Sequence, residues 1–95
     1  MGTMPRLSRA LIVLSALALA ACAGAEGRKS AFLAQGQKHM AERNWQKARV
    51  EFRNVLQVDP KDSRAVFLLG VASERLGDYS AAAGAYKQAL DIDKT

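Results

Sequence analysis

The stretch Ala31–Asp59, AFLAQGQKHMAERNWQKARVEFRNVLQVD, decides the fold because it occurs twice. The second copy begins 34 residues later, so that Ala31 matches Ala65 and Gly36 matches Gly70. Further identities are Ala48 with Ala82, Leu56 with Leu90 and Asp59 with Asp93, and matches in kind are Asn44 with Asp78, Trp45 with Tyr79, Phe52 with Tyr86, Arg53 with Lys87 and Val58 with Ile92. A fixed period of this size predicts an architecture of stacked structural repeats.

Each copy has the pattern of two helices joined by a tight turn. The expected helices cover residues 31–42, 45–58, 64–76 and 79–92. Asn44 and Asp78 are residue types favoured at the N-cap of the helix after each turn, and Gly77 suits a left-handed helix terminus. The chain is therefore expected to be all-α. An ordinary helical hairpin with incidental glycines is the alternative.

Apolar residues recur at helical spacing on one face of each second helix. They are Ala48, Phe52, Val55 and Leu56 in the first copy and Ala82, Tyr86, Ala89 and Leu90 in the second. Gly36 and Gly70 occupy the same phase of the two first helices, although glycine lowers helix propensity. Two glycines at one phase predict that helices cross closely there.

These positions resemble the tetratricopeptide repeat pattern, whose period is also 34 residues. The resemblance rests on Gly36, Ala48, Phe52, Pro60, Leu69, Gly70, Ala82, Tyr86 and Ala89. It implies an α-solenoid fragment of two helix-turn-helix repeats, over residues 30–62 and 63–95. Gln35, His39 and Lys94 depart from the pattern, because the family usually has an apolar residue, an aromatic residue and a proline there.

Residues 1–21 are expected to form a lipoprotein signal peptide. Arg6 and Arg9 precede an apolar run, and small residues follow it, which is the order of a secretory signal. The run is shorter than the about 20 residues of a membrane-spanning helix. Residues 19–22, Leu-Ala-Ala-Cys, resemble the bacterial lipoprotein box, which implies that Cys22, the only cysteine, carries the lipid. The alternative is an ordinary signal peptide with a chance cysteine.

Residues 22–29 are expected to be a short, flexible, lipid-anchored tether because they are small and polar. By resemblance to Gram-negative lipoproteins, Ala23 after the cysteine favours the outer membrane. The expected location is therefore the cell envelope, with the repeats facing the periplasm.

The net charge of +5 includes Arg6 and Arg9 of the signal. From residue 23 onward, twelve Lys and Arg against nine Asp and Glu leave +3, with the excess in the first repeat. This basic repeat would either press against anionic lipid or form a solvated helix face, and the second interpretation is favoured. No aromatic residues interleave the basic ones, so nucleic acid is not an expected partner.

The sequence contains no catalytic constellation, so we do not expect an enzyme or a cofactor. It has no Ser/His/Asp order, metal-ligand spacing or glycine-rich phosphate loop. His39 is the single candidate metal ligand. Because no second ligand lies within sequence reach, a helix-packing histidine is favoured and no metal site is expected.

The expected partner-binding groove lies on the first helices, which line the concave face in the family that the chain resembles. Its residues are Leu33, Gln37, Met40, Phe67, Val71 and Glu74, with Arg64 and Arg75 at its edge. An apolar patch with charged edges suits an amphipathic protein or peptide segment, with Met40 and Phe67 as anchors. Alternatively, Phe67 and Val71 pack against a neighbouring repeat.

Two repeats are fewer than the three or more that usually bury a continuous core. We therefore expect either the front of a longer array or an open end that a partner or a second copy covers by self-association.

The predicted function is a membrane-anchored adaptor that binds a protein or peptide in an envelope assembly, export or exopolysaccharide system. Residues 45–62 are similar to repeat lipoproteins associated with exosortase-type and pilus-assembly systems. An accessory or truncated N-terminal module of a larger envelope enzyme complex is the alternative.

Overall fold

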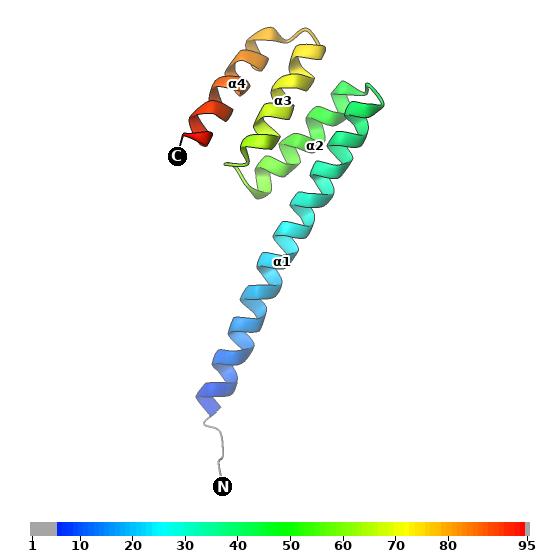
Figure 1. Ribbon diagram of the computed structural model, residues 1–95. Coiled ribbons are helices and arrows are strands. Elements are labelled where there is room, and N and C mark those ends of the chain that lie inside the picture. The colour runs from blue at the N-terminus through cyan, green and yellow to red at the C-terminus, as the bar shows by residue number, and fades with distance from the viewer. Residues whose placement is uncertain (1–5, 95) are drawn as a thin grey trace.

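The computed structural model describes the backbone of residues 6–94 and the side chains of residues 24–94. It contains the helices α1 (Arg6–Ala41), α2 (Trp45–Val58), α3 (Ser63–Arg75) and α4 (Tyr79–Asp93). The helices form two hairpins, α1–α2 and α3–α4, which are joined where α2 packs on α3 (Figure 1). No strand occurs in the described part of the chain. The all-α prediction is confirmed.

The two hairpins turn through the same backbone conformation. Arg43 and Gly77, which are 34 residues apart, have φ angles of 58° and 82°. The N–H of the residue after each of them donates to a carbonyl near the end of the preceding helix, over 2.8 Å in the first turn and 2.9 Å in the second. The left-handed terminus predicted at Gly77 is confirmed. Its counterpart, Arg43, accepts the same conformation although it bears a side chain.

Carboxylate and amide side chains begin the three helices after α1. Asn44 and Asp78 accept hydrogen bonds from the backbone N–H groups three residues later, which confirms the predicted N-caps of α2 and α4. Asp62 caps α3 in the same way, because its Oδ1 accepts from the Ala65 N–H at 3.0 Å.

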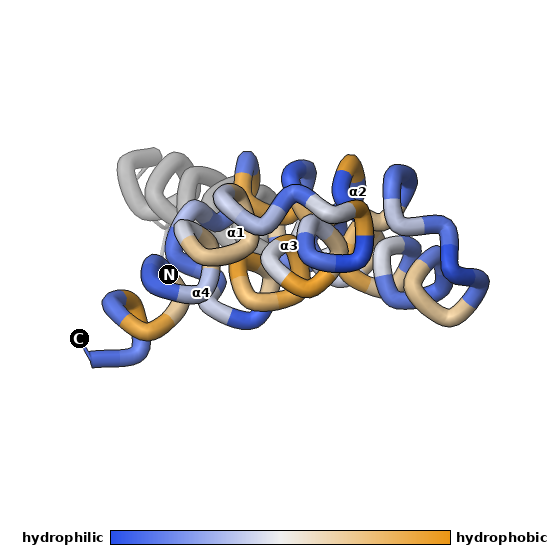
Figure 2. The backbone as a smooth tube through the Cα atoms, turned by 90° about the horizontal axis from the view of Figure 1, so that it is seen from above, coloured by the Kyte–Doolittle hydropathy of each residue, from blue (hydrophilic) through white to orange (hydrophobic). Residues whose placement is uncertain are grey.

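The core lies between the helices in two adjoining clusters. In the first cluster, Ala48 and Phe52 of α2 meet Ala72 of α3, and all three are fully buried. Leu33, Met40, Leu68 and Leu69 pack around it. The second cluster joins Val66 to Ala85 and Ala89, with Leu56 and Ile92 around it. Apolar and polar segments alternate along the coloured turns of the helices in Figure 2, as expected of helices that bury one face.

Glycine allows each hairpin to close around an aromatic ring. A Cβ added at Gly36 would lie 2.8 Å from Cδ1 and 2.9 Å from Cζ of Phe52. One added at Gly70 would lie 2.8 Å from Cε1 of Tyr86. The close crossing predicted at the two glycines is therefore confirmed.

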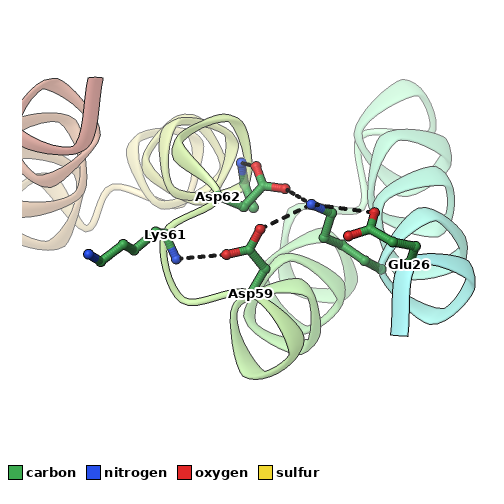
Figure 3. A network of polar contacts seen from close by, with 6 residues as sticks. Glu26, Asp59, Lys61 and Asp62 are labelled. Carbon is green, nitrogen blue, oxygen red and sulfur yellow. Dashed lines mark hydrogen bonds and ion pairs between the residues drawn. The ribbon is translucent and has the colours of Figure 1, made fainter. Parts of the chain in front are cut away.

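Residues 22–29, which are expected to be a flexible tether, belong to the continuous helix α1 in the structure. Their attachment to a lipid stays a prediction. Lys29 holds this part of the helix to the loop before α3. Its partners Glu26, Asp59 and Asp62 are labelled in Figure 3. Its Nζ lies 3.0 Å from Asp59 Oδ2, 3.3 Å from Asp62 Oδ2 and 3.9 Å from Glu26 Oε2. Opposite charges from three sites thus favour helix where the composition alone suggested a loose linker.

The signal peptide predicted for residues 1–21 and the lipidation site at Cys22 lie outside the residues whose side chains are described. Within the described residues, none of the helices combines the length and the apolar character that crossing a bilayer requires.

We predict that Gly36→Ala destabilises the protein, because the new methyl group would overlap the fully buried Phe52 ring. Overpacking should outweigh the gain in helix propensity and lower the free energy of unfolding by about 1–2 kcal/mol. Gly84→Ala is the matched control, since nothing lies within 4 Å of its added Cβ. It should stabilise α4 by about 0.5–1 kcal/mol. Urea unfolding followed by circular dichroism measures both, and equal effects of the two substitutions would contradict the prediction.

We also predict that Lys29→Met destabilises the protein most at neutral pH. The hydrogen bond to Asp59 raises the pKa of Lys29 above 10.5, and the same bond, with the Lys61 N–H, lowers the pKa of Asp59 below 3.8. The contribution of Asp59 is lost as the pH falls through its folded-state pKa, and that of Lys29 is lost as the pH rises through its own. The difference in urea midpoint between wild type and variant should therefore shrink in acid and in strong alkali. A difference independent of pH would argue against the ion pairs, and Lys87→Met on exposed α4 surface is the control.

Candidate functional site

A groove of about 510 Å³ lies between the start of α3 and the end of α4. It is lined by Ser63, Arg64 and Phe67 of α3 and by Tyr86, Ala89, Leu90 and Asp93 of α4. We call this surface the terminal groove. Its middle is apolar, and its charged residues come from the first turn of α3 and the last turn of α4.

Large apolar side chains are exposed along the terminal groove. Phe67 is 50% exposed and Leu90 is 63% exposed. The rings of Phe67 and Tyr86 lie 5.5 Å apart between centroids and are tilted by 42°, a favourable aromatic arrangement. Neighbouring exposed apolar groups of this size favour a contact with another molecule.

The repeat explains why these side chains are uncovered. Phe52 and Val55 of the first repeat are fully buried, because α3 packs against α2. In the second repeat Tyr86, the counterpart of Phe52, is half-buried, and Ala89, the counterpart of Val55, is buried. Leu90, the counterpart of half-buried Leu56, is mostly exposed. The terminal groove is thus the second-repeat version of the surface that α3 covers in the first repeat.

A second depression, of about 350 Å³, continues the face toward the other end of α3. Val71, Glu74, Arg75, Tyr79 and Tyr86 line it. The Tyr86 hydroxyl donates a 2.6 Å hydrogen bond to Glu74 Oε2. This bond, together with burial, raises the pKa of Tyr86 to about 12. Tyr86 therefore lines both depressions, with its ring fixed by Phe67 and its hydroxyl fixed by Glu74.

The structure brings together the five predicted groove residues of the second repeat. Arg64 and Phe67 line the terminal groove, and Val71, Glu74 and Arg75 line the second depression. Arg75 also places its guanidinium over the Trp45 ring, 5.6 Å from the centroid, so that it links α3 to α2.

The predicted residues of α1 have a different environment. Leu33 and Met40 are partly buried against the cluster of Ala48, Phe52 and Ala72, so they contribute to the packing between helices. Gln37 is half-buried. Met40 is thus held by the core rather than exposed as an anchor, because α3 lies against this part of the first repeat.

The residues that α4 contributes to the terminal groove were not included in the predicted site. The helical spacing predicts Tyr86, Ala89 and Leu90 as packing residues that two repeats leave partly uncovered, and Asp93 is predicted only as the match of Asp59. The sequence signal that would have identified them is their period. They match the first-repeat residues Phe52, Val55, Leu56 and Asp59.

His39 is a largely buried side chain of α1. Its Nδ1 is 3.8 Å from Glu42 Oε2, and its side chain is 18% exposed. Among the described side chains, no three His, Cys, Asp or Glu residues gather closely enough to hold a metal ion.

Comparison with known families gives a match to the tetratricopeptide repeat over residues 33–95, about two thirds of the chain. The chain belongs to the tetratricopeptide repeat family. Comparison with curated proteins and comparison with solved structures gave no match. Tetratricopeptide repeats generally mediate protein–protein interaction, and their stacked helices form extended binding surfaces. The exposed apolar face of α3 and α4 is of the kind that such binding requires.

We predict that Tyr86 titrates with a pKa of about 12 because of its hydrogen bond to Glu74. In a Tyr79→Phe background, Tyr86 is the only tyrosine, so absorbance at alkaline pH reports on it alone. Adding Glu74→Gln should lower the measured pKa toward 10.0, the ordinary value for tyrosine. An unchanged titration would show that the hydroxyl does not bind Glu74.

Proposed function

We propose that the protein is a membrane-anchored tetratricopeptide repeat adaptor that holds a protein partner in a cell-envelope assembly, export or exopolysaccharide system. The observation that carries the binding role is the exposure of Phe67 and Leu90 in a groove whose first-repeat counterpart is covered by a helix. Because these two side chains are 50% and 63% exposed, covering them with a partner would contribute roughly half to two thirds of the about 1.5–3 kcal/mol that full burial of such a side chain gives.

The anchor is proposed from the sequence. Basic, apolar and small residues precede Cys22 in the order of a lipoprotein signal, and Cys22 is the only cysteine of the chain. Each buried methylene contributes about 0.8 kcal/mol, so that two or three acyl chains would hold the protein stably on a membrane. Ala23 after the cysteine supports the outer membrane, with the repeats in the periplasm.

The role that we propose is binding without catalysis. The side chains with polar groups in the terminal groove are Ser63, Arg64, Tyr86 and Asp93. This set contains neither a histidine nor a cysteine that would activate or supply a nucleophile. It suits the orientation of a bound protein segment, for which a few polar groups at the margin of an apolar surface are sufficient.

The anchor is tested with Cys22→Ser in a Gram-negative host that is fed a labelled fatty acid. The wild type should incorporate the label and sediment with the outer membrane, whereas Cys22→Ser should do neither. Label in both proteins, or in neither, would contradict lipidation at this residue.

The binding role is tested by photo-crosslinking in cell envelopes from positions 67 and 50. Val50 is the matched control because it is 53% exposed, apolar and outside both depressions of the α3–α4 face. A photoreactive residue at position 67 should give a defined adduct that position 50 does not give, and Leu90→Lys should remove the adduct. The same adducts from both positions would exclude the terminal groove as the contact surface.

A further inference from the structure

A further depression, of about 400 Å³, lies between the two helices of the first hairpin. We call it the α1–α2 groove, and its lining residues are Ala25, Arg28 and Phe32 of α1 and Asn54, Gln57 and Val58 of α2. Asn54 follows Phe52 by two residues, so it points about 200° away from the buried Phe52 ring around α2. The α1–α2 groove is therefore separate from the surface that α3 covers.

The course of α1 leaves this groove open. The second repeat is joined to the first by the turn of residues 59–62, which brings α3 against α2. Val66 is consequently fully buried, in a cluster to which Leu56 of α2 contributes. At the equivalent place before the first repeat, residues 25–28, the described backbone has no turn, because α1 runs on past the end of α2 (Figure 1). Phe32, the counterpart of Val66, therefore stays half-buried.

The α1–α2 groove contains a positive charge that no described carboxylate neutralises. Lys29 is paired with the three carboxylates that approach this end of α1, which belong to Glu26, Asp59 and Asp62. Arg28 points about 100° away from Lys29 around the helix, and among the described residues it has no ion-pair partner. None of the residues that line the groove is acidic. The groove therefore suits an anion.

The guanidinium of Arg28 is directed toward the proposed anchor. Its Nη1 lies 3.8 Å from the position that a Cβ added at Gly24 would take, so the side chain runs back along α1. Gly24 follows Cys22 by two residues, which is a rise of about 3 Å along a helix. With acyl chains on Cys22 in a bilayer, the guanidinium would lie at the level of the lipid phosphates.

We propose that the α1–α2 groove binds the headgroup of an anionic phospholipid at the surface of the membrane that holds the protein. The proposal rests on the anchor of the proposed function. Arg28 binds the phosphate through paired N–H donors, and the amides of Asn54 and Gln57 offer hydrogen bonds to the rest of the headgroup. The half-buried Phe32 and Val58 contact the glycerol and the first methylenes of the acyl chains. A lipid is the occupant because this end of α1 would lie at the bilayer surface, where phospholipid headgroups are the abundant anions.

The proposal is tested with the full-length protein from a Gram-negative host, in non-ionic detergent micelles, titrated with short-chain phosphatidylglycerol. Heteronuclear NMR of the Arg28 Nε–H and of the Asn54 and Gln57 amides reports on the groove. We expect saturable shifts of these signals, and Arg28→Gln should weaken binding by at least about tenfold. Arg28→Lys should retain part of the affinity, because lysine binds phosphate as a point charge. Arg53→Gln, which removes an exposed arginine of α2 outside the groove, is the matched control and should leave binding unchanged.

Two further ligands decide what the groove recognises. Short-chain phosphatidylcholine, whose choline compensates the phosphate charge, should bind more weakly than phosphatidylglycerol. Inorganic phosphate should give no saturable shift, since it has no apolar part to contact Phe32 and Val58. Equal binding of either ligand would overturn the proposal, because the groove would then select neither an anionic headgroup nor a lipid. Absence of saturable shifts with phosphatidylglycerol, or shifts that Arg28→Gln leaves unchanged, would overturn it as well.

These outcomes are distinguishable from failure of the anchor. If Cys22 incorporates the labelled fatty acid but the groove does not bind phosphatidylglycerol, the anchor stands and the lipid site is wrong. If the groove binds phosphatidylglycerol through Arg28 but Cys22 takes up no label, the lipid site stands and the proposed anchor is wrong.

Discussion

The fold depends on the contact between a ring on the second helix of each repeat and a glycine on the first. Phe52 packs where Gly36 has no side chain, and Tyr86 packs where Gly70 has none. These contacts set how closely the helices of each hairpin approach, and so determine the surface that the hairpin offers to the next helix. In the first repeat α3 covers that surface and Phe52 is fully buried. In the second repeat the same geometry leaves Tyr86 half-buried beside the exposed Phe67 and Leu90.

Most of the fold could be predicted from the sequence because the repeat period, the capping residues and the turn residue all predict the same helix boundaries. The period of the chain, the N-cap residues Asn44 and Asp78, and the left-handed Gly77 together placed the four helices to within a residue or two of their observed ends, apart from the start of α1. The start of α1 could not be predicted in this way. The part of α1 around Lys29 is held by Asp59 and Asp62, which are distant in sequence and become its neighbours only when the chain has folded.

The candidate site was predictable only in part, for a similar reason. Helical spacing identified the residues of one face of α3, and the structure keeps Arg64, Phe67, Val71, Glu74 and Arg75 on one surface. Spacing within one helix does not show which neighbouring helix completes the surface. The groove is completed by Tyr86 and Leu90 of α4, whereas Leu33 and Met40 of α1 are taken up by internal packing. Whether residues of α4 or of α1 line the groove depends on how the helices of each hairpin pack, and this cannot be read from the spacing of apolar residues.

The unbroken course of α1 has a consequence for how the repeats would be presented from a membrane. An α-helix advances about 1.5 Å and rotates about 100° with each residue. If Cys22 is the attachment point, the helix from there to Leu33 spans about 16 Å and fixes an angular register as well as a height. One residue inserted before Lys29 would change the height very little but would swing the α3–α4 surface through more than a quarter turn relative to the anchor. In a stiff helical stalk of this kind, the number of residues therefore determines the direction in which the repeats face.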